Sequence, residues 1–416
     1  MASMAFMIKN CFAAILALAW ITLPAGAASF SVKRGINLDI WTTWPGESRW
    51  GESDVLLPFP EWRRTVGEPE LKALRKDGFD FVRIPVDPAP FLSGTTGRLR
   101  DRLFEEVVTA ARLVQKAGLK VIVDLHLIPA GDDRSVGMKQ VMDDPDLFAR
   151  YVELVRQMAR ALAREDPSRL ALELMNEPVI DCEGPAAGLW PDRLKKLFAA
   201  ARASATRLTL ILEGGCWGSA EGLAALDPSD FPDDNIIWSF HSYAPFLLTH
   251  QGATWAGDFI RYVTGIPYPP HELKEDERDR ILENIRRRIR TDAPLTRRSG
   301  MLAYLDEEFA KLDTAARLDA ALSQPFETVA AWAGEHGVEP QDIILGEFGM
   351  IRQEYGSDAV MPAASRAAYV GDMVERAEAR GYGWSVWSYG GAFGIVDEFG
   401  GRKAEPDVMQ VVRDLK

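Results

Sequence analysis

The stretch Leu170–Pro178, LALELMNEP, contains the pattern that decides the fold. It begins as a mainly apolar run, without the strict alternation of a strand that faces water on one side. Such runs are typical of strands buried on both faces in a parallel sheet. The run ends in the polar sequence Asn176-Glu177-Pro178. We therefore predict a buried strand whose carboxyl end carries side chains capable of chemistry.

Seven further runs of this kind occur along the chain, and segments with helical spacing lie between them. The runs are Arg34–Ile40, Phe79–Val86, Lys120–His126, Leu208–Gly214, Asn235–Tyr243, Asp342–Phe348 and Gly383–Tyr389; the helical segments include Leu103–Val114, Leu147–Arg164, Arg193–Ser204 and Arg366–Arg380. Eight strand-helix units in one domain predict an α/β fold, a single (β/α)8 TIM barrel. An open dinucleotide-binding sheet is disfavoured because no G-x-G-x-x-G follows the first run.

The segment between the sixth and seventh runs is too long for one loop and one helix. Placing the sixth helix at Pro325–Gly337 leaves an insertion at about 244–324 over the active face. Within this insertion, Leu282, Ile285 and Ile289 recur at helical spacing among many charges and predict a solvated helix over Glu272–Asp292.

The first residues resemble a secretory signal. Lys9 precedes the apolar run Cys11–Leu23, which is followed by the small residues Ala25-Gly26-Ala27. This order predicts a signal peptide over residues 1–27 and a mature catalytic barrel over residues 28–416. The apolar run is too short to span a bilayer stably. We therefore expect a secreted or periplasmic protein that has no membrane association after the signal is removed.

Composition narrows the class of partner. The 416-residue chain has a net charge of −13 and is 47% hydrophobic, as expected for a soluble globular protein. A negative protein repels the phosphate backbone, so nucleic acid is not expected as a partner. We expect a monomer.

Polar residues gather at the carboxyl ends of the predicted strands, where barrel enzymes carry their chemistry. They are Arg83, His126, Asn176, Glu177, His241, Tyr243, Glu347 and Trp387. Each one alone could have a structural role, such as a salt bridge, a capped turn or core packing. Burying all of them on one rim without a function would carry a large desolvation cost. Together they indicate a catalytic site.

This ordered set resembles glycoside hydrolase family 5, over nearly the whole mature chain from Arg34-Gly35-Ile36-Asn37 to Trp387. The family belongs to a clan of retaining β-glycosidases with glutamates at the ends of strands 4 and 7. The resemblance implies that Glu177 is the acid/base and Glu347 the nucleophile. Two carboxyl groups about 5 to 5.5 Å apart can cleave a glycosidic bond with retention of configuration.

The residue types suggest roles for the other members of the set. Arg83 and Tyr243 can keep Glu347 ionised by charge and hydrogen bonding. The negative charge of Glu347 should in turn keep Glu177 protonated. Asn176 is placed to bond the sugar 2-OH. We expect His126 and His241 to hydrogen-bond sugar hydroxyls or to tune the acid Glu177. Trp387 should offer an apolar surface under the sugar ring.

Tryptophans near the same rim predict further sugar contacts. Rigid amphipathic rings suit stacking on pyranose faces, and we expect Trp41, Trp44 and Trp217 to do so. The alternative is that many of the tryptophans pack loops. No spacing of metal ligands is found in the sequence, so we expect neither a metal nor a cofactor.

These features predict a hydrolase that cleaves a β-linked polysaccharide or oligosaccharide by double displacement, specifically an endo-β-1,4-glucanase (cellulase). The alternatives are a β-mannanase and a β-1,3-glucan or exopolysaccharide hydrolase, because no motif decides hydroxyl selectivity. A transglycosylase would share every catalytic residue. A non-catalytic glycan-binding barrel is disfavoured because binding alone has no use for both Glu177 and Glu347.

Two cysteines follow the predicted signal, Cys182 after the fourth run and Cys216 after the fifth. Consecutive strands of a barrel are neighbours, so the two loops should begin side by side. An exported chain meets an oxidising compartment in which a disulfide can persist. We favour a Cys182–Cys216 disulfide over two free thiols.

Overall fold

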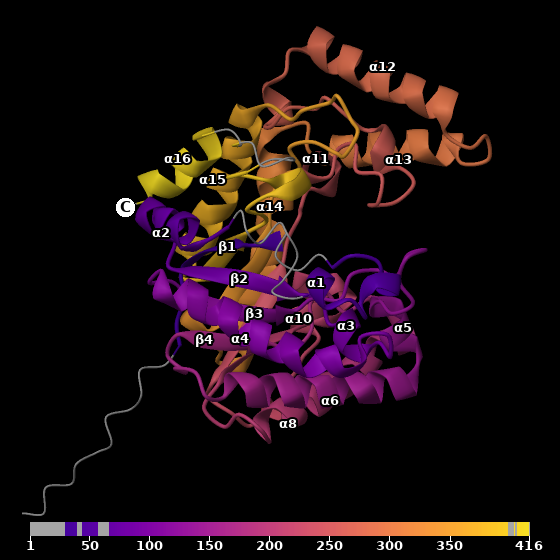
Figure 1. The fold of residues 1–416 in the computed structure, drawn as a ribbon. Helices are drawn as coiled ribbons and strands as arrows, with labels where there is room; N and C mark the ends of the chain where they lie inside the picture. Colours follow the sequence, from indigo (N-terminus) through magenta and orange to yellow (C-terminus); the bar gives the residue numbers. More distant parts are fainter. Residues whose placement is uncertain (1–29, 40–43, 57–65, 398–402, 404–405, 416) are drawn as a thin grey trace, which may run out of the picture.

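The computed structural model describes residues 30–39, 44–56, 66–397, 403 and 406–415 (Figure 1). Eight parallel strands pair in chain order, and the first also pairs with the eighth, so the sheet closes into a barrel. The predicted (β/α)8 fold is confirmed. The strands are β1 (Arg34–Asn37), β2 (Phe81–Val86), β3 (Lys120–Leu125), β4 (Leu170–Glu173), β5 (Thr209–Glu213), β6 (Ile236–His241), β7 (Ile343–Phe348) and β8 (Gly383–Val386).

One principal helix follows each strand and covers the outside of the barrel. In order these are α2 (Glu68–Asp77), α4 (Arg100–Lys116), α6 (Pro145–Leu162), α8 (Leu189–Arg202), α10 (Ala220–Ala224), α14 (Ala315–His336), α15 (Ala363–Ala379) and α16 (Pro406–Asp414). Residues at the start of a helix decide where it begins. At α6, the side chain of Asp144 accepts hydrogen bonds from two backbone N–H groups, and Pro145 occupies the first helical position.

Further helices lie in the connections. They are α1 (Ser53–Leu56), α3 (Ala89–Leu92), α5 (Met138–Asp143), α7 (Gly184–Ala187), α9 (Gly215–Gly218), α11 (Phe246–Thr249), α12 (Glu275–Asp292) and α13 (Arg298–Ala310). Figure 1 shows α12 and α13 beside each other at the top, beyond one end of the barrel. The predicted charged helix corresponds to α12, which buries Leu282, Ile285 and Ile289.

The predicted start of the sixth helix at Pro325 is wrong. Helix α14 begins at Ala315, where Thr314 caps it, and Pro325 lies buried inside it. A proline in a helix interior removes one hydrogen bond and costs about 3 kcal/mol. The buried stripe that includes Leu318, Leu322 and Phe326 continues through this position, so packing on the barrel outweighs that cost. The insertion after β6 therefore ends before Ala315.

The inside of the barrel is filled in two layers. Because alternate residues of a strand face the same side, residues two apart on one strand both point inward. The lower layer is apolar and comprises Phe30, Val32, Phe81, Ile122, Ala171, Ile211, Ile237 and Ile344. Gly35 leaves room for the ring of Phe81, which would lie 2.1 Å from an added Cβ. The layer above it, towards the strand ends, is polar and forms the floor of the site.

The predicted signal, residues 1–27, lies outside the described residues. Among the helices in the described part of the chain, none has both the length and the apolar character needed to cross a membrane.

Candidate active site

Arg83 on β2 lies at the centre of the polar layer and is fully buried. Its guanidinium lies 2.7 Å from Glu173 Oε2, 2.6 Å from Glu347 Oε1 and 3.0 Å from Asp124 Oδ2. Burial alone would lower the pKa of Arg83, but these three carboxylates outweigh burial and raise the pKa above its ordinary value. Arg83 is therefore a fixed positive charge under the strand ends.

Glu347 on β7 is held at both carboxylate oxygens. Arg83 bonds Oε1, and the hydroxyl of Tyr243 donates a hydrogen bond of 2.9 Å to Oε2. Burial, together with the negative charge of Glu347, raises the pKa of Tyr243 well above its usual value, so its hydroxyl keeps its proton and remains a donor. One charged donor, Arg83, and one neutral donor, Tyr243, therefore hold the two oxygens of the Glu347 carboxylate in place.

Glu177 sits just beyond β4 with a positive φ of 41°. Its side chain is 31% exposed, and its Oε1 lies 2.9 Å from His241 Nδ1. Burial within the barrel mouth is the largest cause that raises the pKa of Glu177, and the negative charge of Glu173 acts in the same direction. The sequence predicts that the charge of Glu347 keeps Glu177 protonated, whereas burial is the main cause in the structure. Glu177 is thus the member of the pair suited to carry a proton.

The two predicted catalytic glutamates face each other across the barrel mouth. A carboxylate oxygen of Glu177, one of Glu347 and a ring nitrogen of His241 all lie within 4.8 Å of one another. Glu173, Glu213 and His241 form a second such group below them. Groups of this kind can hold a metal ion. Here several of the donor atoms already face each other at hydrogen-bond distance, which protons explain without a metal.

His126, Asn176 and Trp387 complete the rim. His126 Nδ1 lies 2.9 Å from Asp124 Oδ2, and burial lowers the pKa of His126. Its ring stacks on Trp387 with centroids 5.6 Å apart and planes 15° apart. Asn176 is buried, and its Oδ1 accepts a 2.7 Å hydrogen bond from Arg83. The structure thus brings all eight predicted rim residues to one end of the barrel.

Four buried polar residues of this site were absent from the predicted set: Asn37, Asp124, Glu173 and Glu213. Asn37 Oδ1 accepts a hydrogen bond from Arg83. A signal for three of them exists in the sequence, because Asp124, Glu173 and Glu213 each follow an inward apolar residue by two positions.

The predicted tryptophan platforms differ in their surroundings. Trp44 is only 2% exposed, and its indole N–H donates to the carbonyl oxygen of Asp87, so it packs the loop and cannot stack on a sugar. Trp41 lies outside the described residues. Trp217 is 48% exposed, on the turn after β5. Trp255, in the insertion, is 61% exposed and lies near His250 and Phe393.

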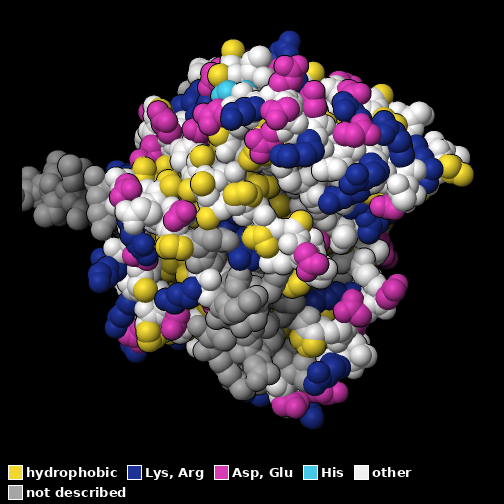
Figure 2. Space-filling model, turned by 90° about the horizontal axis from the view of Figure 1, so that it is seen from above, with side chains coloured by type: hydrophobic (Ala, Val, Ile, Leu, Met, Phe, Trp, Pro, Cys, Tyr) yellow, Lys and Arg dark blue, Asp and Glu magenta, His cyan; other side chains and the backbone are white. Residues whose placement is uncertain are grey.

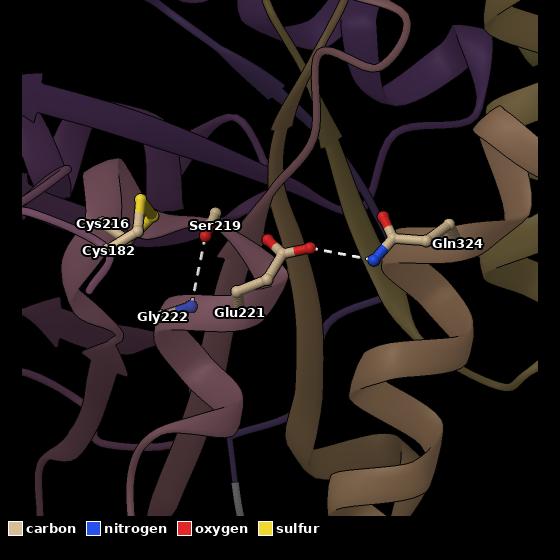
Figure 3. The surroundings of a disulfide bond; sticks show 6 residues. All are labelled: Cys182, Cys216, Ser219, Glu221, Gly222 and Gln324. Carbon is tan, nitrogen blue, oxygen red and sulfur yellow. Dashed lines mark hydrogen bonds between the residues drawn. A yellow bond between two sulfur atoms is a disulfide. The ribbon is translucent and has the colours of Figure 1, made fainter. Parts of the chain in front are cut away.

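A disulfide joins Cys182 and Cys216, with their Cα atoms 4.5 Å apart (Figure 3). Cys182 follows β4 and Cys216 follows β5, so the bond links the loop after Glu177 to its neighbour. Closing a loop of this length is expected to stabilise the fold by about 3 to 4 kcal/mol, mainly through the unfolded state. Beside the bond, Glu221 on α10 accepts a 2.9 Å hydrogen bond from Gln324 (Figure 3).

A (β/α)8 barrel with a facing carboxyl pair at its mouth has the architecture of a glycosidase. The family model for cellulase, glycosyl hydrolase family 5, matches residues 44–393. The chain therefore belongs to glycosyl hydrolase family 5.

Individual relatives agree with this family. The chain is 24% identical over 343 residues to endoglucanase 3 of Fibrobacter succinogenes, covering 80% of this chain and 47% of that protein. It is 26% identical over 240 residues to endoglucanase C of Acetivibrio thermocellus, covering 58% of this chain and 65% of that protein. The chain thus matches about half to two thirds of the length of these relatives.

Among solved structures, the fold resembles that of the clostridial cellulose synthase subunit Z from Clostridioides difficile. The TM-score is 0.63 at 22% identity, and the match covers 92% of this chain and 99% of that one. This likeness supports the barrel fold.

Proposed function

We propose that this chain is a secreted retaining β-glycosidase that acts on β-linked glucan as an endo-β-1,4-glucanase. The observation that carries the proposal is the pair Glu177 and Glu347, whose carboxylate oxygens lie within 4.8 Å. This closeness suits a direct attack by one carboxylate, whereas an inverting enzyme needs about 6.5 to 9.5 Å to admit a water molecule.

In the first step, Glu347 attacks the anomeric carbon while the bond from this carbon to the glycosidic oxygen breaks. Glu177 gives its proton to the departing oxygen, which leaves as a sugar hydroxyl. Arg83 and Tyr243 hold the attacking carboxylate in place. In the second step, Glu177 takes a proton from water, and the resulting hydroxide displaces Glu347 from the sugar. Two inversions give net retention.

Two aromatic rings, Trp217 and Trp387, suggest where a long glucan would lie. Trp217 lies on the turn after β5, the strand next to β4. The backbone N–H of Trp217 donates a hydrogen bond to the carbonyl oxygen of Pro178, which places Trp217 near the acid/base Glu177. Trp387 lies beside His126 on the rim. We propose that Trp387 supports the sugar at the cleavage point and that Trp217 stacks on a sugar of the leaving group.

The decisive test of the activity is a screen of soluble polysaccharides with sizing of the products. We expect carboxymethylcellulose and mixed-linkage β-glucan to give short oligosaccharides and a rapid fall in viscosity. Preferred cleavage of mannan or β-1,3-glucan would instead support the alternative substrates. Elongated products would indicate a transglycosylase, and binding without any turnover would overturn the proposal.

The roles of the two glutamates need a separate test. We expect Glu177→Ala to form the covalent intermediate from an aryl cellobioside with a good leaving group, and azide to rescue its breakdown. Glu177→Gln serves as the isosteric control. Full activity of the Ala variant on polymer would contradict the acid/base role.

The proposed export rests on residues 1–27 and is supported by the Cys182–Cys216 disulfide, a bond typical of oxidising compartments. We expect the exported protein to begin at Ala28, as read by amino-terminal sequencing. We also propose that it works as a monomer without metal or cofactor. Lys and Arg side chains lie among Asp and Glu side chains on the face in Figure 2, in keeping with a partner other than nucleic acid.

A further inference from the structure

Glu213, at the end of β5, contacts both the acid/base and its histidine. Its Oε2 accepts a 2.7 Å hydrogen bond from the backbone N–H of Glu177. Its Oε1 lies 3.1 Å from His241 Nε2, and neither of these two atoms has another hydrogen-bond partner. The other ring nitrogen of His241, Nδ1, lies 2.9 Å from Glu177 Oε1. The three residues therefore form a closed loop of contacts.

The turn after β5 is shaped around this carboxyl group. Gly218 has a φ of +68°, and an added Cβ there would lie 1.9 Å from Glu213 Oε1. Only glycine fits this conformation and this space. Two residues before Gly218, the disulfide of Cys216 links the turn to the loop after β4. The backbone thus fixes the position of Glu213.

The surroundings of Glu213 favour its neutral form. It is 1% exposed, and burial raises its pKa well above the ordinary value, with added repulsion from the carboxylates of Glu173 and Glu177. Arg83 on β2 is the nearby cation and acts in the opposite direction. Burial also lowers the pKa of His241 to about 4, so the histidine is neutral near pH 7.

The position of one hydrogen between Glu213 and His241 decides the state of the acid/base. If Glu213 is neutral, its O–H donates to Nε2, and His241 carries its own proton on Nδ1 and donates to Glu177 Oε1. If Glu213 were ionised, the proton of His241 would sit on Nε2. The bare Nδ1 would then attract the proton of Glu177 into an internal hydrogen bond, away from the substrate.

We propose that Glu213 is a neutral carboxylic acid that positions Glu177 and fixes the tautomer of His241. This role rests on the proposed glycosidase function and adds a positioning residue to it. Glu213 fixes the backbone of Glu177 through Oε2 and leaves the outer oxygen of Glu177 free to carry the catalytic proton. After proton transfer, the Nδ1–H of His241 stabilises the carboxylate that activates water.

The first test is Glu213→Gln, because an amide reproduces a neutral acid. Its oxygen can accept from the Glu177 N–H, and its NH2 can donate to His241 Nε2. We expect kcat on soluble β-glucan within about threefold of wild type and unchanged limbs of the pH profile. The matched control is Glu221→Gln, which changes a nearby exposed glutamate whose partner is Gln324. A loss of activity in Glu213→Gln alone would overturn the proposal.

The second variant, Glu213→Leu, removes both contacts. We expect kcat on β-glucan to fall by about 10- to 100-fold with little change in KM. Formation of the intermediate from a dinitrophenyl cellobioside should stay within about threefold of wild type, since this leaving group needs no proton. Equal losses on both substrates would show a general structural defect and count against a role through the acid.

A third measurement is independent of turnover. Nitrogen NMR of folded protein labelled in its histidines should show His241 protonated at Nδ1 in wild type and in Glu213→Gln. Protonation at Nε2 would overturn the proposal even in an active enzyme. Conversely, an Nδ1 proton in a protein that cleaves no β-glycan would overturn the proposed function and keep the hydrogen-bond assignment. Activity should also survive chelating agents; its loss would assign the Glu173, Glu213 and His241 group to a metal.

Discussion

The two layers inside the barrel have the same backbone and opposite chemistry. Each of four strands places an apolar residue in the lower layer and an ionisable residue two positions later in the upper layer. These pairs are Phe81 and Arg83, Ile122 and Asp124, Ala171 and Glu173, and Ile211 and Glu213. The lower layer releases apolar surface from water and stabilises the fold. The upper layer buries charges and is costly unless each is paired. On each of these strands, the residue that stabilises the fold and the residue that serves the site are therefore only two positions apart.

The charge balance of the upper layer sharpens this contrast. Arg83 is the one cation that directly contacts Asp124, Glu173 and Glu347 among the described residues. Burial raises the pKa of Asp124 to about 7, so the acids of this layer do not all ionise together near neutral pH. A packed apolar layer would cost less free energy to bury than these polar groups. We infer that the polar layer serves catalysis.

The largest effect is expected from Glu347→Gln. Loss of the nucleophile should reduce kcat by about 10⁴-fold or more, because the covalent route is closed. The fold should remain, since the amide keeps the size of the side chain. Steady-state kinetics and calorimetric glycan binding test this expectation, and the Glu221→Gln protein is the control. Substantial turnover by Glu347→Gln would remove this residue from the mechanism.

Arg83→Met should damage both activity and stability. It leaves several buried carboxylates without their cation, and breaking buried pairs in this way costs about 3 to 5 kcal/mol. Denaturant unfolding measures the loss. Arg83→Lys keeps the charge without the planar guanidinium and should recover part of the stability but little activity. If the Met variant were as stable as wild type, the charges of the upper layer would not be paired as we describe.

Ile211→Ala tests the lower layer on the strand that carries Glu213. Removing this buried side chain should lower the free energy of unfolding by about 2 to 5 kcal/mol. At temperatures where the variant stays folded, kcat should be near that of wild type, because the side chain lies in the buried apolar layer beneath the site. If Ile211→Ala lost activity as severely as Glu213→Leu, the two layers would not have the separate roles that we assign to them.

The smallest effect concerns pH. Activity needs protonated Glu177, and burial raises the pKa of this carboxyl. As pH rises through that raised pKa, Glu177 loses its proton and the rate should fall, so the alkaline limb should lie above the ordinary range of a glutamate. A pH profile of kcat/KM on a soluble glucan measures this limb, and a profile that stays flat into strongly alkaline pH would contradict the mechanism.

Much of the architecture followed from the sequence. All eight strands lie within the predicted runs, and the rim residues lie where their runs end. This is possible because strand burial and strand period are local properties, and because parallel closure brings every carboxyl end to the same face. The predicted start of the sixth helix at Pro325 failed for the opposite reason: local proline chemistry was overridden by packing against distant elements.

The amino-acid sequence by itself determined the barrel, its polar rim and the pair Glu177 and Glu347. Only the tertiary structure decided that Trp44 is buried, that Trp217 is exposed and that Glu213 lies between Glu177 and His241. The physical reason is that residue type and spacing fix which face of a strand a side chain takes. Its neighbours, its burial and hence the position of its proton depend on loops that are distant in sequence and adjacent in space.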